Sequence, residues 1–372
     1  MPTIADSDLD TLVKDLDCCY EEGNEIARMA PAALAAARAA GVFTMTVPPD
    51  PCELPELMYV LRRVAWAEPG VAWSAANSTV FGSVAARVGD EARAALMAQV
   101  DSGPLAFSGV PGQVTATDDG YLLDGSWPFV TGIDDADLAV LVGRVGQSRP
   151  PDVRFCVVDP VHARIGSAWN TVAGMRTTGS NSVDASGLVL GPDRAVRLSD
   201  EPMVDDPLYR LPMFPYFLGT GVAVLLGVFR RGVEEAIELI AGKVSSIDHK
   251  AAAELAPTQL AMTGADAALR ACEDTFAALV DRMWAEVIAD GSVSPATRGT
   301  AYSTFPFVVD TAVGALGRLY SAATTQAWPA SSRVHRALTD LHVLSIGFAR
   351  PRGLELDAAR VLVGRDPVDP TF

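Results

Sequence analysis

Two segments of this chain carry aromatic and hydroxyl side chains in an arrangement that could hold a flat, conjugated ligand. The first is GYLLDGSWPFVTG, residues 120–132, and the second is WNTVAGMRTTGSNSVD, residues 169–184. In the first, Trp127 and Phe129 could cover the face of a ring while the hydroxyl of Thr131 bonds to its edge. Two aromatic residues two positions apart are also typical of one buried face of a β-strand, so the segment alone leaves both interpretations open.

Other catalytic patterns are missing from the sequence. The four histidines form no cluster with cysteine, and no GxGxxG follows a strand, so neither a zinc site nor a dinucleotide-binding turn is indicated. No GxSxG elbow or P-loop occurs. Asp134, Asp135 and Asp137 lie close together but favour a solvated turn over a metal site. His335 and His342 share a helix face, yet a third ligand is lacking.

The charge balance excludes several classes of partner. With 29 basic and 46 acidic residues the formal net charge is -17, which repels nucleic-acid phosphates and anionic lipid. Five cysteines without a CxxC pair, and an acidic N-terminus where a signal peptide needs a basic head, favour a reducing compartment. We therefore expect a cytoplasmic protein that binds neither nucleic acid nor membrane.

The most apolar stretch of the chain is the uncharged segment 211–229, LPMFPYFLGTGVAVLLGVF, which is long enough to cross a bilayer. It contains two prolines and three glycines, and no second such segment follows. A buried core helix is therefore the favoured interpretation, and the chain is expected to be soluble.

The chain divides by composition into helical, strand-rich and helical parts. Residues 8–67 and 72–100 are rich in Ala and Leu at helical spacing, whereas 105–195 hold short Val- and Thr-rich runs between DDG, DG and DP turns. Helical periodicity returns after residue 207, with helices expected at about 257–289, 306–327 and 332–348. The predicted fold class is α+β, with a helical domain at 1–103, a central β domain at 104–200 and a four-helix-bundle domain at 201–372.

Both opening segments resemble strands of the acyl-CoA dehydrogenase superfamily. Residues 120–132 are similar to its GY-x-(L/V)-x-G-x-W-x-F-x-(S/T)-G strand pair, and residues 169–184 to its W-x-x-x-G-(M/L)-R-x-T-x-S strand. The resemblance is strongest to one branch of the superfamily, the two-component flavin-dependent monooxygenases that are similar to 4-hydroxyphenylacetate hydroxylase. It implies an N-terminal helical domain, a central β-barrel or sandwich, a C-terminal helical bundle and a flavin cofactor, FAD or FMN.

The resemblance also implies roles for the residues of the first segment. Trp127 or Phe129 would line the flavin face, and Thr131 would reach the N5/O4 edge of the flavin, where a hydroxyl can bond to the reduced ring. The turn from Ser108 to Gly112 matches the family's loop above the flavin, where backbone amides can serve the carbonyl edge of the ring.

Two residues of the second segment would lie near the cofactor or a domain junction. These are Arg176 and Ser180, by the same resemblance. For Arg176 alone, a solvated arginine in a β-turn is the competing interpretation.

The segment ASSRVHRALTDLHVLSIGF resembles the family's R-x-x-R-D-x-H-x-x-x-x-H helix, with two departures. Thr339 replaces an arginine, and Gly347 stands where the family has a second histidine that helps to manage the oxygenated flavin. His342 is the matching histidine and our candidate acid/base, although a lone helix histidine is often structural.

Three functions are compatible with these residues. The first is a flavin-dependent oxidoreductase, a monooxygenase or oxidase, that acts on a small organic substrate with reduced flavin from a separate reductase. The second is an acyl-CoA dehydrogenase-like enzyme with a displaced base, because neither 346–348 nor 216–217 supplies the usual carboxylate. The third is a catalytically lapsed scaffold of the same fold. The family's R-x-x-x-F-G pyrophosphate signature is missing after Lys243, which leaves FAD against FMN open.

The substrate pocket is expected to be apolar or neutral, and this composition fits many small aromatic or aliphatic ligands. By analogy with the family we also expect a homodimer or homotetramer. The candidate lining residues are Trp73, Asn77, Phe81, Tyr216 and Phe217.

Overall fold

The structure is a computed structural model that describes residues 4–148, 151–244, 251–323, 325–347 and 352–368. His249 and Phe348, which figured in the sequence analysis, lie outside the described residues. By its contacts the chain forms two compact units. The first takes in residues within 1–57, 70–172 and 176–213, and the second those within 58–69, 173–175 and 214–372.

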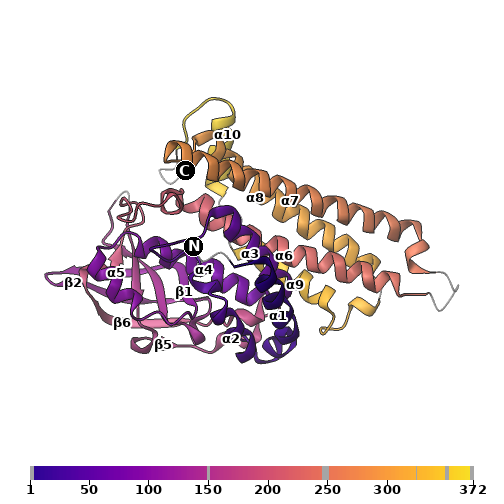
Figure 1. Ribbon diagram of the computed structural model, residues 1–372, viewed down its shortest axis with the longest axis horizontal. Coiled ribbons are helices and arrows are strands. Elements are labelled where there is room, and N and C mark those ends of the chain that lie inside the picture. Colours follow the sequence, from indigo (N-terminus) through magenta and orange to yellow (C-terminus); the bar gives the residue numbers. More distant parts are fainter. Residues whose placement is uncertain (1–3, 149–150, 245–250, 324, 348–351, 369–372) are drawn as a thin grey trace. The chain divides into compact units, whose positions relative to one another are not determined.

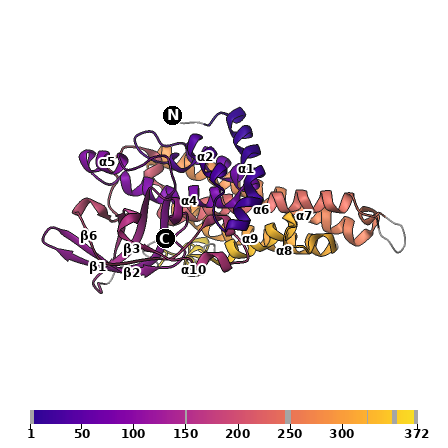
Figure 2. The same cartoon turned by 90° about the horizontal axis from the view of Figure 1, so that it is seen from below.

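The helices of the first unit are α1 (Asp6–Ile26), α2 (Pro31–Ala39), α4 (Pro69–Ala85) and α5 (Asp90–Met97). Helix α1 forms because Leu9, Leu12, Val13 and Leu16 recur at helical spacing, and this apolar stripe is buried. Helix α4 is buried on almost every side, so its sequence shows no polar face. Figures 1 and 2 show α4 and α5 on one side of the sheet.

The sheet of the first unit has seven strands in the order β5-β6-β2-β1-β3-β4-β7. Strands β1 and β3 run parallel, and the other neighbouring pairs are antiparallel. The described strands thus form one mixed sheet, and the predicted α+β class is confirmed. The bounds are β1 (Leu105–Thr117), β2 (Gly120–Trp127), β3 (Leu138–Val145), β4 (Asp152–Val158), β5 (Arg164–Ile165), β6 (Val183–Leu190) and β7 (Ala195–Val196).

The hairpin between β1 and β2 follows from the DDG turn. Thr117 pairs with Gly120, and Gly120 has a φ of 146°, a conformation that a side chain would resist. The core of the sheet is built from inward-facing side chains of several strands, among them Val114, Leu123, Trp127 and Leu141. The hairpin therefore fixes the register that carries Trp127 into the core.

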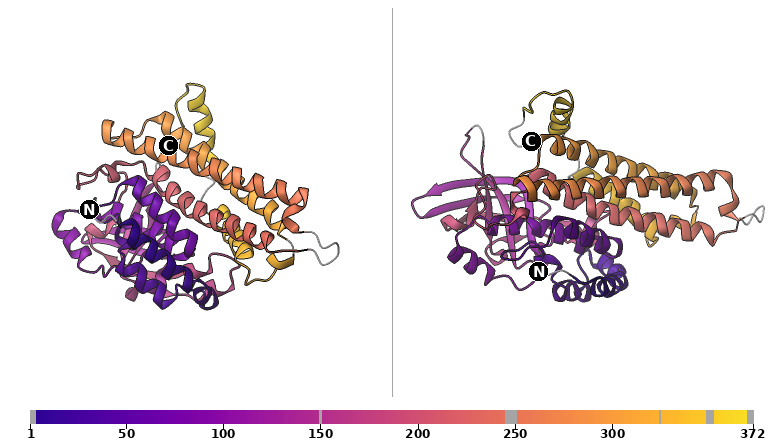
Figure 3. Two further views of the ribbon diagram at one scale, coloured as in Figure 1. Left: turned by 45° about the vertical axis from the view of Figure 1, so that its right-hand side comes forward. Right: turned by 45° about the horizontal axis from the view of Figure 1, so that its top comes forward.

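The second unit is helical. Its helices are α6 (Met213–Ala241), α7 (Ala256–Asp290), α8 (Pro295–Ala322), α9 (Arg333–Gly347) and α10 (Arg352–Leu362), together with most of α3 (Leu54–Ala67). Helices α7 and α8 pack side by side, and α9 and α10 pack on α8 (Figures 1 and 3). The predicted order of helices, strands and helices is confirmed. The three-domain division at 1–103, 104–200 and 201–372 stays a prediction.

Helix α6 contains the apolar segment that sequence analysis had to interpret. Among the described residues it is the helix long and apolar enough to cross a membrane, and 78% of its most apolar window is buried. This burial is what a core helix of a soluble protein shows.

Two element predictions were wrong. Helix α8 begins at Pro295 and not at Pro306, because the Ser294 hydroxyl caps it by accepting the Thr297 N–H, and Pro306 lies inside the helix. Residues 169–182 are not a strand. They form 3₁₀ turns at Ala168–Thr171 and Arg176–Thr178, and only from Val183 does β6 begin.

Candidate functional site

The segment 128–132, directly after β2, lies between β1 and the turn at 178–181. Backbone bonds hold it on both sides: the Val130 N–H donates to Asn181 O at 2.9 Å, and the Gly132 N–H donates to Thr178 O at 3.0 Å. On the other side the Thr131 N–H points to Phe107 O at 3.4 Å. The buried Ser108 hydroxyl donates to Pro128 O at 3.1 Å. Ser108 therefore anchors this segment, which presents Phe129 and Thr131.

Phe129 is an aromatic side chain that the fold leaves open to solvent. It is 65% exposed, and its backbone has a φ of 58°, which is rare for a residue with a side chain. Its ring meets that of Trp169 edge to face, with centroids 6.0 Å apart. Backbone strain of this kind persists only where the surroundings enforce it, and such positions cluster at ligand sites.

Thr131 lies in a buried cluster of polar side chains. Its hydroxyl accepts the indole N–H of Trp73 at 3.1 Å and is 3.1 Å from the hydroxyl of Ser180. Thr131 and Ser180 are each 4% exposed. One α4 turn beyond Trp73, Asn77 donates from Nδ2 to Trp73 O at 2.7 Å. Trp73 and Asn77 are half-buried.

The pairing of β1 with β3 is interrupted next to this cluster. Its register with β3 jumps between Ser108, opposite Leu141, and Gly112, opposite Gly143, so residues 109–111 bulge out of the ladder. Gly109 and Val110 are exposed there. This bulge is the turn that the family resemblance assigned to the carbonyl edge of the flavin.

Trp127 occupies the core of the sheet and not a ligand surface. Its side chain is 0% exposed, and its indole N–H donates to Val142 O at 2.8 Å. Gly112 and Gly125 lie against the indole, where added Cβ atoms would approach ring atoms to 2.3 and 2.9 Å. Of the two aromatic residues proposed for the flavin face, only Phe129 is placed to serve, and Gly112 makes room for an indole.

Arg176 is half-buried, and backbone oxygens hold two of its three side-chain nitrogens. Its Nε donates to Asn24 O at 2.9 Å, and one terminal nitrogen donates to Asn170 O and Val172 O at 2.9 and 3.0 Å. The Trp169 indole N–H donates to the backbone oxygen of Arg176 at 3.0 Å. Arg176 thus ties α1 to the turn that carries Asn170 and Val172, and its role as a cofactor ligand stays a prediction.

The acidic turn after Gly132 is a structural support rather than a solvated turn. Arg28 donates from Nε to Asp135 at 2.8 Å and from a terminal nitrogen to Asp134 O at 2.7 Å. Asn181 donates to the Asp134 carboxylate at 2.7 Å. Burial raises the pKa of Asp134, while the bond from Asn181 and the charge of Arg28 oppose that shift. Sequence reasoning missed Arg28 and Asn181, because they lie far from this turn in the chain.

Of the expected substrate-pocket residues, Phe81 is fully buried in α4 and does not line an open surface. Tyr216 and Phe217 belong to α6 in the second unit. Tyr216 is buried and Phe217 half-buried, with ring centroids 5.2 Å apart. His342 is exposed on α9, where its backbone oxygen accepts the Ser345 hydroxyl at 2.8 Å.

Within the second unit, Asp340 proves to be the structural residue of the histidine-bearing helix. It is 4% exposed, and its carboxylate accepts the backbone N–H of Met175, whose φ is 51°. Gly174 lies against the backbone of Thr339, where a Cβ would come within 2.6 Å of Thr339 O. The acid in the middle of an apolar helix face was the sequence signal for this role.

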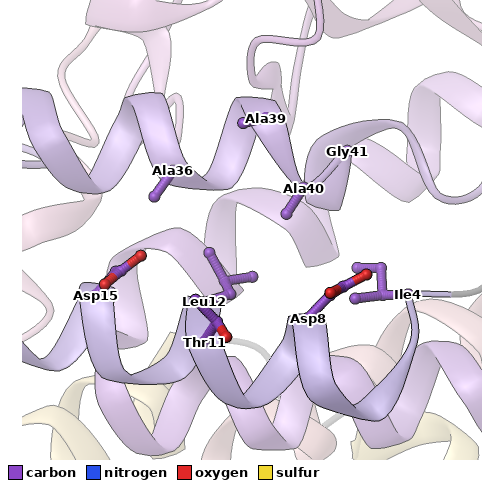
Figure 4. A pocket seen from close by; sticks show the side chains of 9 residues that line it. All are labelled: Ile4, Asp8, Thr11, Leu12, Asp15, Ala36, Ala39, Ala40 and Gly41. Carbon is purple, nitrogen blue, oxygen red and sulfur yellow. The ribbon is translucent and has the colours of Figure 1, made fainter.

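A groove of about 430 Å³ between α1 and α2 lies apart from these residues (Figure 4). Its α2 side is lined by Ala36 and Ala39, and its charged groups are the carboxylates of Asp8 and Asp15. Two carboxylates without a basic side chain repel a flavin phosphate, so this groove does not suit the cofactor.

The residues around Phe129 do suit an isoalloxazine ring. An exposed phenyl ring can cover its face, a buried hydroxyl at Thr131 can bond its edge, and the bulge at 109–111 offers backbone amides. In the described residues no group of three or more His, Cys, Asp or Glu side chains could hold a metal ion.

One family model and several solved structures resemble this chain. Residues 220–348 match the family of the acyl-CoA dehydrogenase C-terminal domain. The HsaA monooxygenase from M. tuberculosis has a TM-score of 0.90 at 19% identity over 98% of both chains. XiaF from Streptomyces, solved with FADH2 and glycerol, has a TM-score of 0.88 at 17% identity over 98% of this chain and 96% of XiaF. FMN-bound TdsC from Paenibacillus reaches 0.80 at 19% identity over 97% and 98%. Residues 220–348 thus match this family's C-terminal domain, and the whole chain has the acyl-CoA dehydrogenase-like fold.

The sequence relatives narrow the class. The indole-3-acetate monooxygenase of Acinetobacter baumannii is 25% identical over 300 residues, 76% of this chain and 74% of that protein. The enzyme of the same name from Pseudomonas putida is 27% identical over 175 residues, which span 47% of this chain and 45% of the relative. These two relatives are named as monooxygenases, and a third is named as the oxygenase subunit of a flavin-dependent monooxygenase. Two of the solved structures of similar fold are described with FADH2 or FMN.

Proposed function

We propose that this chain is the oxygenase component of a two-component monooxygenase, which uses reduced flavin from a separate reductase to hydroxylate a small aromatic substrate. The observation that carries the proposal is the pairing of an exposed Phe129 ring with the buried Thr131 hydroxyl on one anchored segment. When bound, reduced flavin would supply the electrons that activate molecular oxygen.

The chain's own part is to position the flavin and to exclude water from it. Phe129 covers the ring face, while the hydroxyl of Thr131 bonds the N5 edge. Thr131 is buried against Trp73 and Ser180, so the bond would form away from bulk water, where it is stronger. Ser108 holds the segment at Pro128, and Arg28 holds Asp134 just beyond its other end, which keeps this geometry fixed.

Substrate contacts form the less direct part of the proposal. On α4, Trp73 and Asn77 offer one half-buried indole and one half-buried amide. From the family resemblance we retain Tyr216 and Phe217 as further lining residues and His342 as the acid/base. An aromatic substrate is favoured because one solved relative, TdsC, is described as bound to indole, and two sequence relatives are named for indole-3-acetate.

Several properties of the assembly follow from the same proposal. The reductase partner is supported by a relative named as an oxygenase subunit. A cytoplasmic location fits the supply of reduced flavin by a nicotinamide-dependent reductase. The homo-oligomer is retained by analogy, and FAD and FMN both stay open, because solved relatives are described with either form.

The test is reconstituted turnover under ¹⁸O₂. Purified chain is mixed with an unrelated flavin reductase, NADH, FMN or FAD, and a panel that contains indole and indole-3-acetate. The proposal predicts a product that carries one ¹⁸O atom and depends on both flavin and the chain. Thr131→Val is the matched variant, because it removes the hydroxyl and keeps the branched shape.

The same preparation separates the alternatives. Oxidation of an acyl-CoA with no incorporated label would replace the proposal with the dehydrogenase interpretation. A chain that binds neither FMN nor FAD in a titration would instead be a lapsed scaffold.

A further inference from the structure

Four side chains of the first unit form a continuous hydrogen-bonded relay. The Trp73 indole N–H donates to Thr131 Oγ1 at 3.1 Å, and Thr131 Oγ1 is 3.1 Å from Ser180 Oγ. Ser180 Oγ in turn donates to Thr178 Oγ1 at 2.8 Å. Thr131, Ser180 and Thr178 are all buried, so bulk water does not compete for these bonds. The relay joins α4 to the turn before β6 through the residue nearest the proposed flavin edge.

Counting the hydrogens of the relay fixes its direction. A hydroxyl carries one hydrogen and an indole nitrogen can only donate. The single hydrogen of Ser180 is used on Thr178, so Thr131 must donate to Ser180 in the bond between them. The single hydrogen of Thr131 is thereby used as well. One lone pair of Thr131 Oγ1 accepts the indole N–H of Trp73. The second lone pair is the group that Thr131 has left for a ligand, so Thr131 can only accept from it.

We propose that Ser180 and Thr178 are positioning residues that fix Thr131 as a hydrogen-bond acceptor, and that this fixed orientation sets the preference for reduced flavin that the proposed function requires. The inference rests on the proposed function. Reduced flavin carries a hydrogen on N5, which an acceptor can bind. Oxidised flavin has no hydrogen on N5, and N5 and the O4 carbonyl beside it are both acceptors. The acceptor Thr131 would therefore face acceptors along this edge.

The magnitude follows from the cost of unpaired buried groups. Leaving a buried acceptor without its partner costs enough to change affinity by about one to two powers of ten. The wild-type chain should therefore bind reduced flavin at least about tenfold more tightly than oxidised flavin. Such selectivity would let the chain take reduced flavin from a reductase and release it once oxidised.

The experiment measures two dissociation constants for each variant, with FMN and FAD as the probes. Oxidised flavin is titrated in air and dithionite-reduced flavin under anaerobic conditions. The readout is the dissociation constant of oxidised flavin divided by that of reduced flavin. Thr178→Val is the decisive variant, because it keeps the shape and leaves Thr131 and Ser180 intact. Without its acceptor, Ser180 can donate to Thr131, which frees the Thr131 hydrogen for oxidised N5. The ratio should then fall by about tenfold.

Two further variants and one control complete the design. Ser180→Ala also frees the Thr131 hydrogen and should lower the ratio to a similar extent. Trp73→Phe should keep the ratio within about threefold of wild type, because Thr131 still donates to Ser180. Ser182→Ala makes the same chemical change two residues along, outside the relay, and should match wild type.

The outcomes distinguish this inference from the function on which it rests. A lowered ratio in Thr178→Val and Ser180→Ala, with Trp73→Phe and Ser182→Ala unchanged, supports the relay. Flavin binding with the same ratio in all five proteins overturns the relay and leaves the proposed function standing. Failure of wild type to bind flavin in either state overturns both. If one relay variant does not fold, the other decides by the same ratio.

Discussion

Gly112 lies so close to the indole of Trp127 that a Cβ on Gly112 would come within 2.3 Å of ring atom Cζ2 and 2.8 Å of Asp124 O. Both neighbours are fixed, since Trp127 is fully buried and Asp124 O belongs to the backbone of β2. The family resemblance assigned Gly112 to the flavin. The structure gives it a second reason to be glycine, which concerns packing.

Gly112→Ala should therefore lower the free energy of unfolding by about 1–3 kcal/mol, the usual cost of overpacking a core. Thermal and urea unfolding of the variant measure this cost. Gly191→Ala is the control, because a Cβ there meets no atom within 4 Å. Equal stability of Gly112→Ala and wild type would show that the hairpin is not packed as described.

Trp127 and Phe129 should give opposite results when each is changed. Trp127→Phe leaves Val142 O without its donor and opens space in the core, so it should cost about 2 kcal/mol of stability and leave flavin affinity unchanged. Phe129→Ala should keep stability within about 0.5 kcal/mol, because the ring is mostly exposed. It should weaken flavin binding by about tenfold through the lost ring contact.

Chemical unfolding and flavin titration of these two variants check the prediction together. If Trp127→Phe weakens flavin binding while its fold stays intact, the assignment of Trp127 to the core alone is contradicted.

The contrast between these residues shows where sequence reasoning ended. The period of two places Trp127 and Phe129 on one face, as long as the strand continues. Strand β2 ends at Trp127, Pro128 follows, and Phe129 takes a φ of 58°, so the alternation breaks at that point. No local sequence pattern predicts a positive φ at a phenylalanine. The motif was therefore located correctly, but the side chain that faces outward could not be chosen from it.

Contacts between residues far apart in the chain could not be predicted from the sequence, for a related reason. The apolar spacing predicted the long helices, and the DDG turn predicted the hairpin. The Trp73 to Thr131 bond joins residues 58 positions apart, and nothing in either local sequence points to the other. Phe81 was taken for a pocket residue because it is apolar, but α4 is buried on almost every face, so apolar character does not separate pocket from core.

Asp340 is expected to support the backbone at Met175. Asp340→Ala removes the acceptor of a buried N–H and should cost about 1–3 kcal/mol in urea unfolding. Asp340→Asn keeps an acceptor oxygen and should recover most of that loss. If Asp340→Ala were as stable as wild type, the hydrogen bond to Met175 would not contribute to the free energy of unfolding, and the prediction would be wrong.

Asp152 should make stability depend on pH in the acid range. The bond from Arg197, joined by one from Arg154, lowers the pKa of Asp152 to about 2. The unfolded carboxyl has a pKa of about 3.9, so the folded state is stabilised above that pH and loses the contribution as the pH falls through about 2. Because the carboxylate is partly solvated, the contribution is about 1 kcal/mol or less.

Asp152→Asn isolates this effect. The variant should be slightly less stable than wild type at pH 7, and the difference should disappear near pH 2. A stability gap that is the same at both values would contradict the assigned pairing with Arg197.

The central claim is that flavin lies against the segment 128–132 and the bulge at 109–111. Hydrogen–deuterium exchange with saturating reduced FMN or FAD tests this location directly, because amides covered by a ligand exchange more slowly. We predict slowed exchange in peptides that cover residues 105–112 and 128–133, and no such change in Thr131→Val at a flavin concentration that saturates only wild type. Saturated binding with exchange in both peptides left unaltered would place the flavin elsewhere and contradict the account.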